Sequence, residues 1–116
     1  LLKKRKILVK GSLNRVRDFI FVDDVINAII KIINSKKFKS DTFNLSTNKL
    51  TSVKRLINTL KALLKSKKKI VFGETTPGDT DGFAGDNKKI KNKFKWEPTL
   101  SLEKGLLEMI KYYKKR

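Results

Sequence analysis

The residues that could take part in chemistry lie in two segments, the run from Arg17 to Asp24 and the loop from Gly73 to Thr80. Arg17 carries a planar guanidinium, which matches paired phosphate oxygens. The loop follows an apolar, strand-like segment and has the glycine spacing of a phosphate-binding P-loop, but Asp79 stands where that motif requires lysine. A carboxylate there would repel a phosphate, so we exclude the P-loop.

The usual catalytic and metal-binding sets are missing from the sequence. It contains no His and no Cys, which removes the usual general base and the usual zinc ligands. Neither Tyr112 nor Tyr113 has a lysine four residues later to lower its pKa, and the later glycines do not have the spacing of a dinucleotide fingerprint. We therefore predict no catalytic residue, no cofactor-binding residue and no metal site.

The apolar pattern predicts an α/β chain in which short strands alternate with helices. Strands are expected at residues 6–10, 18–22, 42–45 and 70–72, and helices at residues 23–35, 53–65, 87–94 and 101–113. The residues placed to cap the long helices are Asp23 or Asp24, Thr51 or Ser52, and Ser101. No clear domain boundary is visible, so residues 1–116 are predicted to form a single region.

The first predicted helix has an unusually wide apolar face, formed by Val25, Ile26, Ile29, Ile30, Ile32 and Ile33. A face of this width predicts contacts on more than one side of the helix. Near the other end, Trp96 precedes Pro98 and is predicted to fill the core as a hydrophobic plug. Tyr112 and Tyr113 are predicted to pack against the core from the last helix.

Six segments of the sequence occur in the order and spacing of the extended short-chain dehydrogenase/reductase (SDR) family. They are residues 17–25 (RDFIFVDDV), 42–46 (TFNLS), 77–79 (PGD), 84–89 (AGDNKK), 94–98 (FKWEP) and 101–106 (SLEKGL). More narrowly, the chain resembles the NAD-dependent nucleotide-sugar epimerases and dehydratases, such as UDP-glucose 4-epimerase. The similarity extends from about Ile7 to Tyr113.

In that family an amino-terminal Rossmann half holds NAD and the catalytic Tyr and Lys, which this sequence lacks. The resemblance implies that residues 1–116 are the carboxy-terminal substrate-binding portion, which grips the nucleotide diphosphate of a sugar substrate. Arg17 would contact the diphosphate and Asp79 would lie near the ribose. An alternative for Arg17 is a surface ion pair with Asp18 or Asp23. Thr76 stands where many members carry a second phosphate-binding arginine, so substrate binding would either use Lys69 or another base or be weaker.

Several expectations follow from the resemblance. NAD would be bound by the full-length enzyme and not by this chain alone, which would be inactive. The wide apolar face of the first helix would meet the Rossmann half, and the complete protein would form a homodimer. The chain begins at Leu1 and its only methionine is Met109, so we expect it to be a piece of a longer protein.

The net charge of +18 suggests a competing function, a small basic module that binds nucleic acid non-specifically. Of the 29 basic residues, 29 − 5 = 24 are lysines, and they occur on most predicted elements rather than on one face. Abundant Lys, Ile, Asn and Phe share AT-rich codons, which explains the charge without a nucleic-acid partner. No apolar run approaches the roughly 18 residues of a membrane span, and no secretory signal is present. We therefore expect a cytoplasmic protein without a membrane partner.

Overall fold

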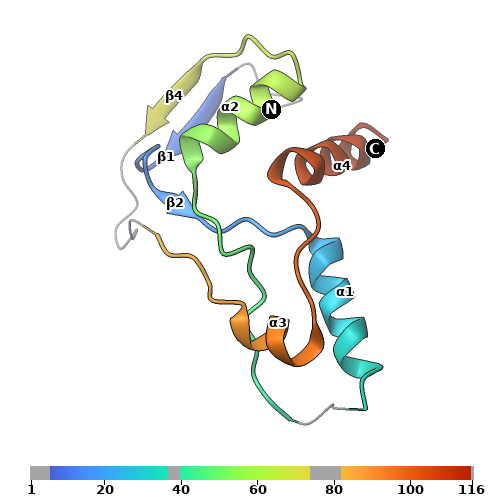
Figure 1. Cartoon of the computed structure of the whole chain (residues 1–116). Helices are drawn as coiled ribbons and strands as arrows, with labels where there is room; N and C mark the ends of the chain where they lie inside the picture. Colours follow the sequence, from blue (N-terminus) through green and yellow to red (C-terminus); the bar gives the residue numbers. More distant parts are fainter. Residues whose placement is uncertain (1–5, 37–39, 74–81, 116) are drawn as a thin grey trace. The chain divides into compact units, whose positions relative to one another are not determined.

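The computed structural model describes residues 6–36, 40–73 and 82–115 (Figure 1). The elements in chain order are β1 (Ile7–Lys10), β2 (Val16–Arg17), α1 (Val22–Ile33), β3 (Thr51–Ser52), α2 (Val53–Leu63), β4 (Ile70–Gly73), α3 (Lys88–Phe94) and α4 (Leu102–Lys114). Strands and helices alternate, which confirms the predicted α/β class. None of the helices in these ranges is long and apolar enough to cross a membrane.

The chain divides into two compact units, each built from two separate stretches of sequence. Unit 1 combines residues 1–17 with residues 51–82, and unit 2 combines residues 18–50 with residues 83–116. Unit 1 contains β1 to β4 and α2 but not α1, whereas unit 2 contains α1, α3 and α4.

Unit 1 is held by two short strand pairs. β1 and β4 are parallel, with a register that runs from Ile7 opposite Ile70 to Lys10 opposite Gly73. β2 and β3 are antiparallel and place Arg17 opposite Thr51. The side chains that form the core are Val9, Val53 and Ile57, with Leu13 and Ile70 packed against them. As predicted, Ser52 caps α2, because its hydroxyl accepts a hydrogen bond from the amide of Arg55 at 3.1 Å.

Unit 2 has a core that α1 and α3 share. The buried residues are Ala28, Ile90, Phe94 and Trp96, with Ile20, Ile32, Phe43 and Leu45 packed against them. Trp96 is buried as predicted, and its indole nitrogen donates a hydrogen bond to the backbone oxygen of Asp24 at 3.1 Å. Ser101 caps α4 by accepting a hydrogen bond from the amide of Lys104 at 3.3 Å.

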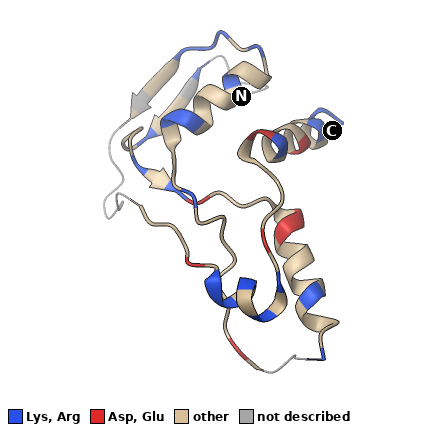
Figure 2. Cartoon of the chain, viewed as in Figure 1, with Lys and Arg blue, Asp and Glu red and all other residues tan. Residues whose placement is uncertain are grey.

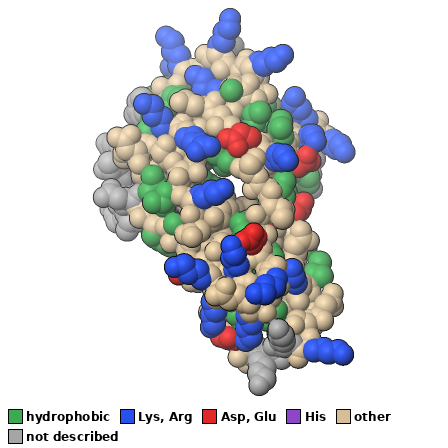
Figure 3. Space-filling view, viewed as in Figure 1, with side chains coloured by type: hydrophobic (Ala, Val, Ile, Leu, Met, Phe, Trp, Pro, Cys, Tyr) green, Lys and Arg blue, Asp and Glu red, His purple; other side chains and the backbone are tan. Residues whose placement is uncertain are grey.

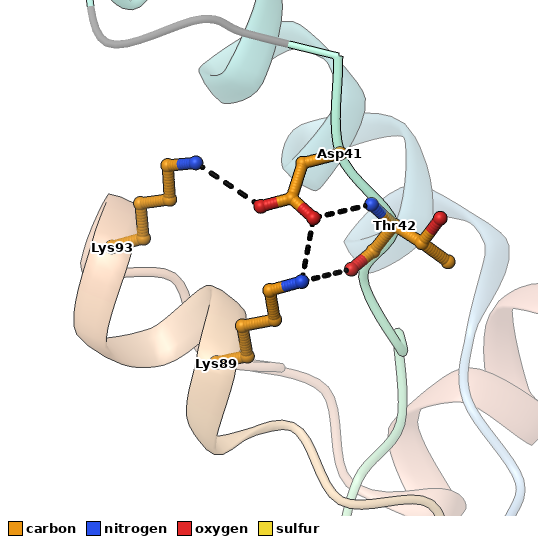
Figure 4. A network of polar contacts seen from close by, with 4 residues as sticks. All are labelled: Asp41, Thr42, Lys89 and Lys93. Carbon is orange, nitrogen blue, oxygen red and sulfur yellow. Dashed lines mark hydrogen bonds and ion pairs between the residues drawn. The ribbon is translucent and has the colours of Figure 1, made fainter.

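Two lysines of α3 hold the segment that precedes Phe43 (Figure 4). The ammonium groups of Lys89 and Lys93 lie 2.6 and 3.2 Å from the carboxylate oxygens of Asp41, and Lys89 also donates to the carbonyl of Thr42 at 2.9 Å. The same ammonium groups lie 5.0 and 5.2 Å from the centre of the Phe43 ring. The hydrogen bond from Lys89 is the main reason that the pKa of Asp41 falls to about 2.

Two predicted strands are wrong. Residues 18–21 and 42–45 are not part of a strand, and the strand in this region is β2, which ends at Arg17. The carboxylate of Asp18 accepts hydrogen bonds from Thr47 and from the amide of Asn48. The start of the first segment is therefore held by a side chain to the residues that follow the second, and not by backbone pairing.

The predicted caps of α1 are also wrong. α1 begins at Val22 with Phe21 as its N-cap residue, and no side chain bonds to the cap. Asp23 and Asp24 lie inside the first turn. The carboxylate of Asp24 instead accepts hydrogen bonds from the amide groups of Thr99 and Leu100.

At the other end of the chain, Tyr112 and Tyr113 are more than half exposed, so their predicted packing against the core is wrong.

Candidate functional site

Arg17, the first of the two predicted substrate-binding residues, is the last residue of β2 in unit 1. Its backbone is paired with Thr51 of β3, and the chain just before it is tied to the start of α2 by a hydrogen bond from the amide of Val53 to the carbonyl of Arg15 at 3.0 Å. The side chain is half-buried, and its Nη1 atom donates to the carbonyl of Val16 at 2.7 Å. The fold therefore holds this guanidinium on a strand rather than on a loop.

Gly82 lies directly against this arginine. Its φ angle is +116°, a conformation that side chains rarely adopt. A Cβ atom at position 82 would overlap the carbonyl oxygen of Val16 and would lie 3.0 Å from Nη1 of Arg17. Only glycine fits this close approach. The sequence analysis considered Gly82 only within a mismatched dinucleotide fingerprint, and the signal it missed is an isolated glycine that follows Pro77-Gly78-Asp79.

Asp79, the second predicted substrate-binding residue, lies outside the described residues, as do Thr76 and Pro77. The described chain resumes at Gly82, three residues after Asp79 in the sequence. The structure therefore places Arg17 and the residue that closes the loop, but not Asp79 itself.

Three of the six family segments meet in unit 2. The hydroxyl of the buried Ser46 donates to the carbonyl of Gly85 at 2.8 Å, and the side-chain amide of Asn87 donates to the carbonyl of Ser46 at 2.9 Å. Asp18 binds the next two residues, Thr47 and Asn48. A Cβ atom at Gly85 would lie 2.7 Å from the Cβ of Ser46, so the Ser46 side chain packs directly against the Gly85 backbone. These residues build the fold rather than a reactive group.

Asp24, in the family segment 17–25, binds the residues that lie between the last two family segments. It is 1% exposed, and its carboxylate accepts from the amide and the hydroxyl of Thr99, at 2.9 and 2.8 Å, and from the amide of Leu100 at 3.1 Å. Both oxygens of this buried carboxylate therefore accept hydrogen bonds from the protein. These bonds give Asp24 a structural role, which is to hold the segment before α4 against α1.

Asp24 and Thr99 also line a cavity of about 550 Å³ in unit 2, between α1 and α3, whose other lining residues include Asn27, Lys31 and Lys95. The ammonium of Lys31 donates to the carbonyl of Lys95 at 2.8 Å. Lys91 forms an ion pair with Glu97 at the rim, and this contact lowers the pKa of Glu97. Neither Arg17 nor Gly82 lines this cavity.

Basic residues lie on elements of both units rather than in one stripe (Figure 2). α2 of unit 1 carries Lys54, Arg55 and Lys61, and α3 of unit 2 carries Lys88, Lys89, Lys91 and Lys93. On the face drawn in Figure 3 the blue Lys and Arg side chains are scattered between tan and green surface. Within the described ranges no group of three acidic side chains could hold a metal ion.

A family model described as GDP-mannose 4,6 dehydratase matches residues 1–109 of this chain. The chain belongs to this family. Its relatives include UDP-glucuronic acid decarboxylase 1 of Xenopus tropicalis, which is 30% identical over 114 residues that make up 98% of this chain and 27% of the relative. Relatives of this chain also include proteins described as UDP-glucose 4-epimerase and dTDP-glucose 4,6-dehydratase, and the predicted family membership is confirmed.

Solved structures agree with this assignment. UDP-glucose 4-epimerase of Thermotoga maritima, solved with UDP-glucose, is 33% identical, with a TM-score of 0.85 over 95% of this chain and 35% of that chain. dTDP-glucose 4,6-dehydratase of Bacillus anthracis, solved in complex with NAD, is 28% identical, with a TM-score of 0.86 over 99% of this chain and 36% of that chain. The chain therefore spans about a third of the length of these family members. The matches give no support to a nucleic-acid-binding module.

Proposed function

We propose that this chain is the part of an NAD-dependent nucleotide-sugar epimerase or dehydratase that binds the nucleotide diphosphate of the substrate. Family membership supports a nucleotide sugar as the ligand, since the Thermotoga relative was solved with UDP-glucose. The position of Arg17 supports its role in binding the diphosphate, because its guanidinium lies against Gly82 at the end of the segment that carries Asp79. This contact is the observation on which the proposal mainly rests.

Arg17 would bind the diphosphate by donating from two guanidinium nitrogens to paired phosphate oxygens. Its place on β2, opposite Thr51, reduces the conformational freedom that ligand binding would otherwise have to remove. Asp79 would accept hydrogen bonds from ribose hydroxyl groups, which a carboxylate can do while remaining ionised. Both roles bind and orient the substrate, and neither moves a proton of the reacting sugar.

The residues of this chain do not fit NAD. A dinucleotide site of this class needs a glycine-rich turn between a parallel strand and a helix, so that the pyrophosphate can approach the backbone. The parallel strands β1 and β4 are followed by Gly11-Ser12-Leu13-Asn14 and by the loop that contains Pro77, and neither sequence has that glycine spacing. We propose that NAD binds only to the family portion that this chain does not contain, and that the chain alone is inactive.

The proposed function can be tested by calorimetric titration of the 116-residue chain with UDP-glucose, dTDP-glucose and GDP-mannose, using glucose as the control. We expect at least one nucleotide sugar to bind with the signature of a single site, and glucose not to bind. Binding of all three ligands that is equally weak and disappears in 0.5 M salt would indicate only attraction to the net charge of +18. The absence of binding by the chain, both alone and in complex with an NAD-binding portion, would refute the proposal.

A further inference from the structure

The cavity between α1 and α3 has the size and the lining of a small-molecule site. Its volume of about 550 Å³ lies within the range of about 300–1,000 Å³ that is common for such sites. The described residues that line it include three lysines, two asparagines, two acids and a tryptophan. The cavity belongs to unit 2, whereas the candidate ligand residue Arg17 belongs to unit 1 and does not line it.

Hydrogen bonds fix the wall of this cavity. Trp96 is 4% exposed, and its indole nitrogen donates to the backbone oxygen of Asp24 at 3.1 Å. The main chain of Lys95 is held twice, because its amide donates to the carbonyl of Lys91 at 2.9 Å and its carbonyl accepts from the ammonium of Lys31 at 2.8 Å. The cavity is therefore formed before any ligand binds, which reduces the entropy that binding must remove.

Both acids of the lining already bind donors of the protein. Asp24 accepts hydrogen bonds from the amide and the hydroxyl of Thr99 and from the amide of Leu100. Glu97 forms an ion pair with Lys91, and both side chains of this pair are more than half exposed. Such an exposed pair contributes little and can open when a stronger anion approaches Lys91.

The other polar groups of the lining are donors that an anion could use. The ammonium of Lys31, in the last turn of α1, gives one of its three N–H groups to the carbonyl of Lys95 and keeps two. The ammonium of Lys95, the residue that ends α3, and the side-chain amides of Asn27 and Asn92 bind no other group in the part of the chain that the structure describes. An ammonium suits a phosphate with several free oxygens, and an amide suits a hydroxyl group.

We propose that this cavity is a binding site for a small phosphate monoester of the sugar phosphate class. The terminal phosphate would bind the ammonium groups of Lys31 and Lys95, which approach from different helices, and the amides of Asn27 and Asn92 would bind hydroxyl groups of the sugar. A monoester carries a charge of about −1.5 to −2 at neutral pH. Each phosphate of a nucleotide sugar is esterified on both sides and carries only one charge, so a pair of lysines favours the monoester. The site is additional to the proposed function and does not rest on it.

The test uses Trp96 as a local reporter, because it is the only tryptophan of the sequence and it lines the cavity. The probe is glucose 6-phosphate, and the controls are glucose and inorganic phosphate. We expect glucose 6-phosphate to change the Trp96 fluorescence of the 116-residue chain in a saturable manner, with the same Kd in calorimetric titration. Inorganic phosphate should bind at least tenfold more weakly, and glucose should not bind.

Charge-matched variants locate the bound probe. Lys31→Gln combined with Lys95→Gln should weaken glucose 6-phosphate binding at least tenfold. The matched control is Lys36→Gln combined with Lys88→Gln, which removes the same charge from two exposed residues of unit 2 that do not line the cavity. This control and Arg17→Ala should leave the Kd unchanged. Circular dichroism checks the helix content of the variants, and the single variant Lys95→Gln replaces the double variant if helix content is lost.

Several results would overturn the proposal. They are the absence of saturable binding of glucose 6-phosphate, binding that leaves Trp96 fluorescence unchanged, equal affinities for glucose 6-phosphate and inorganic phosphate, and equal weakening by the two double variants. Loss of binding in Arg17→Ala would also overturn it, because the monoester would then occupy the site of the proposed function. A chain that binds glucose 6-phosphate as predicted but binds no nucleotide sugar would count against the proposed function and leave this site intact.

Discussion

The Asp24 carboxylate in the first turn of α1 accepts hydrogen bonds from both the amide and the hydroxyl of Thr99, a residue 75 positions later in the chain. Asp24 also accepts from the amide of Leu100, and its backbone oxygen accepts from the Trp96 indole. This one residue therefore connects α1 with the segment between α3 and α4. The ammonium of Lys31 adds a further contact between these parts by donating to the carbonyl of Lys95 at 2.8 Å.

Replacing Asp24 with alanine should destabilise the protein substantially. The partly buried amide groups of Thr99 and Leu100 would lose their acceptor, at a cost of about 1–3 kcal/mol in the free energy of unfolding. Urea unfolding monitored by Trp96 fluorescence would measure the change. The matched control is Asp23→Ala, since Asp23 lies in the same helical turn but is exposed, and it should cost less than about 1 kcal/mol. Equal effects of the two substitutions would contradict the structural role of Asp24.

Gly82 and Gly85 should tolerate alanine poorly, whereas Gly73 should tolerate it. At Gly85 an added Cβ would lie 2.7 Å from the Cβ of Ser46, while at Gly73 the nearest atom is 3.5 Å away. We expect Gly85→Ala to cost about 1–3 kcal/mol through displaced backbone and Gly73→Ala to be close to neutral. Thermal unfolding of both variants would show the difference, and a stable Gly85→Ala protein would contradict the close contact.

Gly82→Ala should act on the ligand site as well. The substitution forces an unfavourable φ angle and pushes the chain away from Val16 and Arg17. We expect weaker binding of the nucleotide sugar together with lower stability, whereas Gly85→Ala should lower stability without a specific loss of affinity. Calorimetric titration of both variants with the nucleotide sugar, at a temperature where both are folded, separates the effect on affinity from the effect on stability.

The Asp41 contacts predict a pH dependence. The pKa of Asp41 is lowered to about 2 by Lys89 and Lys93, so the ionised carboxylate is favoured in the folded protein. Its contribution to stability is present above the ordinary pKa of 3.8 and disappears as the pH falls from about 4 to about 2. The effect is small, because these groups are partly exposed and screened by salt.

The measurement is the difference in urea midpoint between the wild type and Asp41→Asn as a function of pH. The wild type should be more stable at pH 6, and the difference should shrink towards pH 2. Addition of 1 M NaCl at pH 6 should also reduce it. A difference that is the same at pH 2 and pH 6 would show that the carboxylate charge does not contribute.

Local patterns predicted the helices and the caps Ser52 and Ser101, because a cap and its partner are three residues apart and leave a signal in the sequence. The same reasoning failed for Asp24. An aspartate before an apolar helix fits a cap equally well, and its true partner Thr99 is too distant in sequence to be recognised. Placing Asp24 on the buried side of α1 with Ala28, four residues later, would have indicated a buried acceptor.

The strands and units were harder to predict. β2 and β3 have two residues each, which is too short for an alternating pattern. The predicted strand at residues 18–22 has the right composition, but Asp18 binds Thr47 and Asn48 through its side chain. The polypeptide passes from one unit to the other after residues 17, 50 and 82, and the amino-acid composition does not change at these points. The family resemblance supplied the candidate Arg17, and the contact with Gly82 became visible only in three dimensions.

The chain alone should be catalytically silent, because it lacks the Tyr-x-x-x-Lys pair and a dinucleotide loop. We expect no change in absorbance at 340 nm when it is mixed with NAD and any nucleotide sugar. Nucleotide sugar analysed after incubation should be unchanged. Turnover that scales with the concentration of the purified chain would contradict the assignment of chemistry to another part of the enzyme.

The central claim is that Arg17 binds the diphosphate of a nucleotide sugar, and a pair of charge-matched variants tests it most directly. Arg17→Ala and Arg55→Ala each remove one positive charge, but Arg55 lies exposed on α2. Calorimetric titration with the tightest-binding nucleotide sugar should show affinity reduced about 10- to 100-fold by Arg17→Ala and unchanged by Arg55→Ala. Equal affinities of the two variants would contradict the claim.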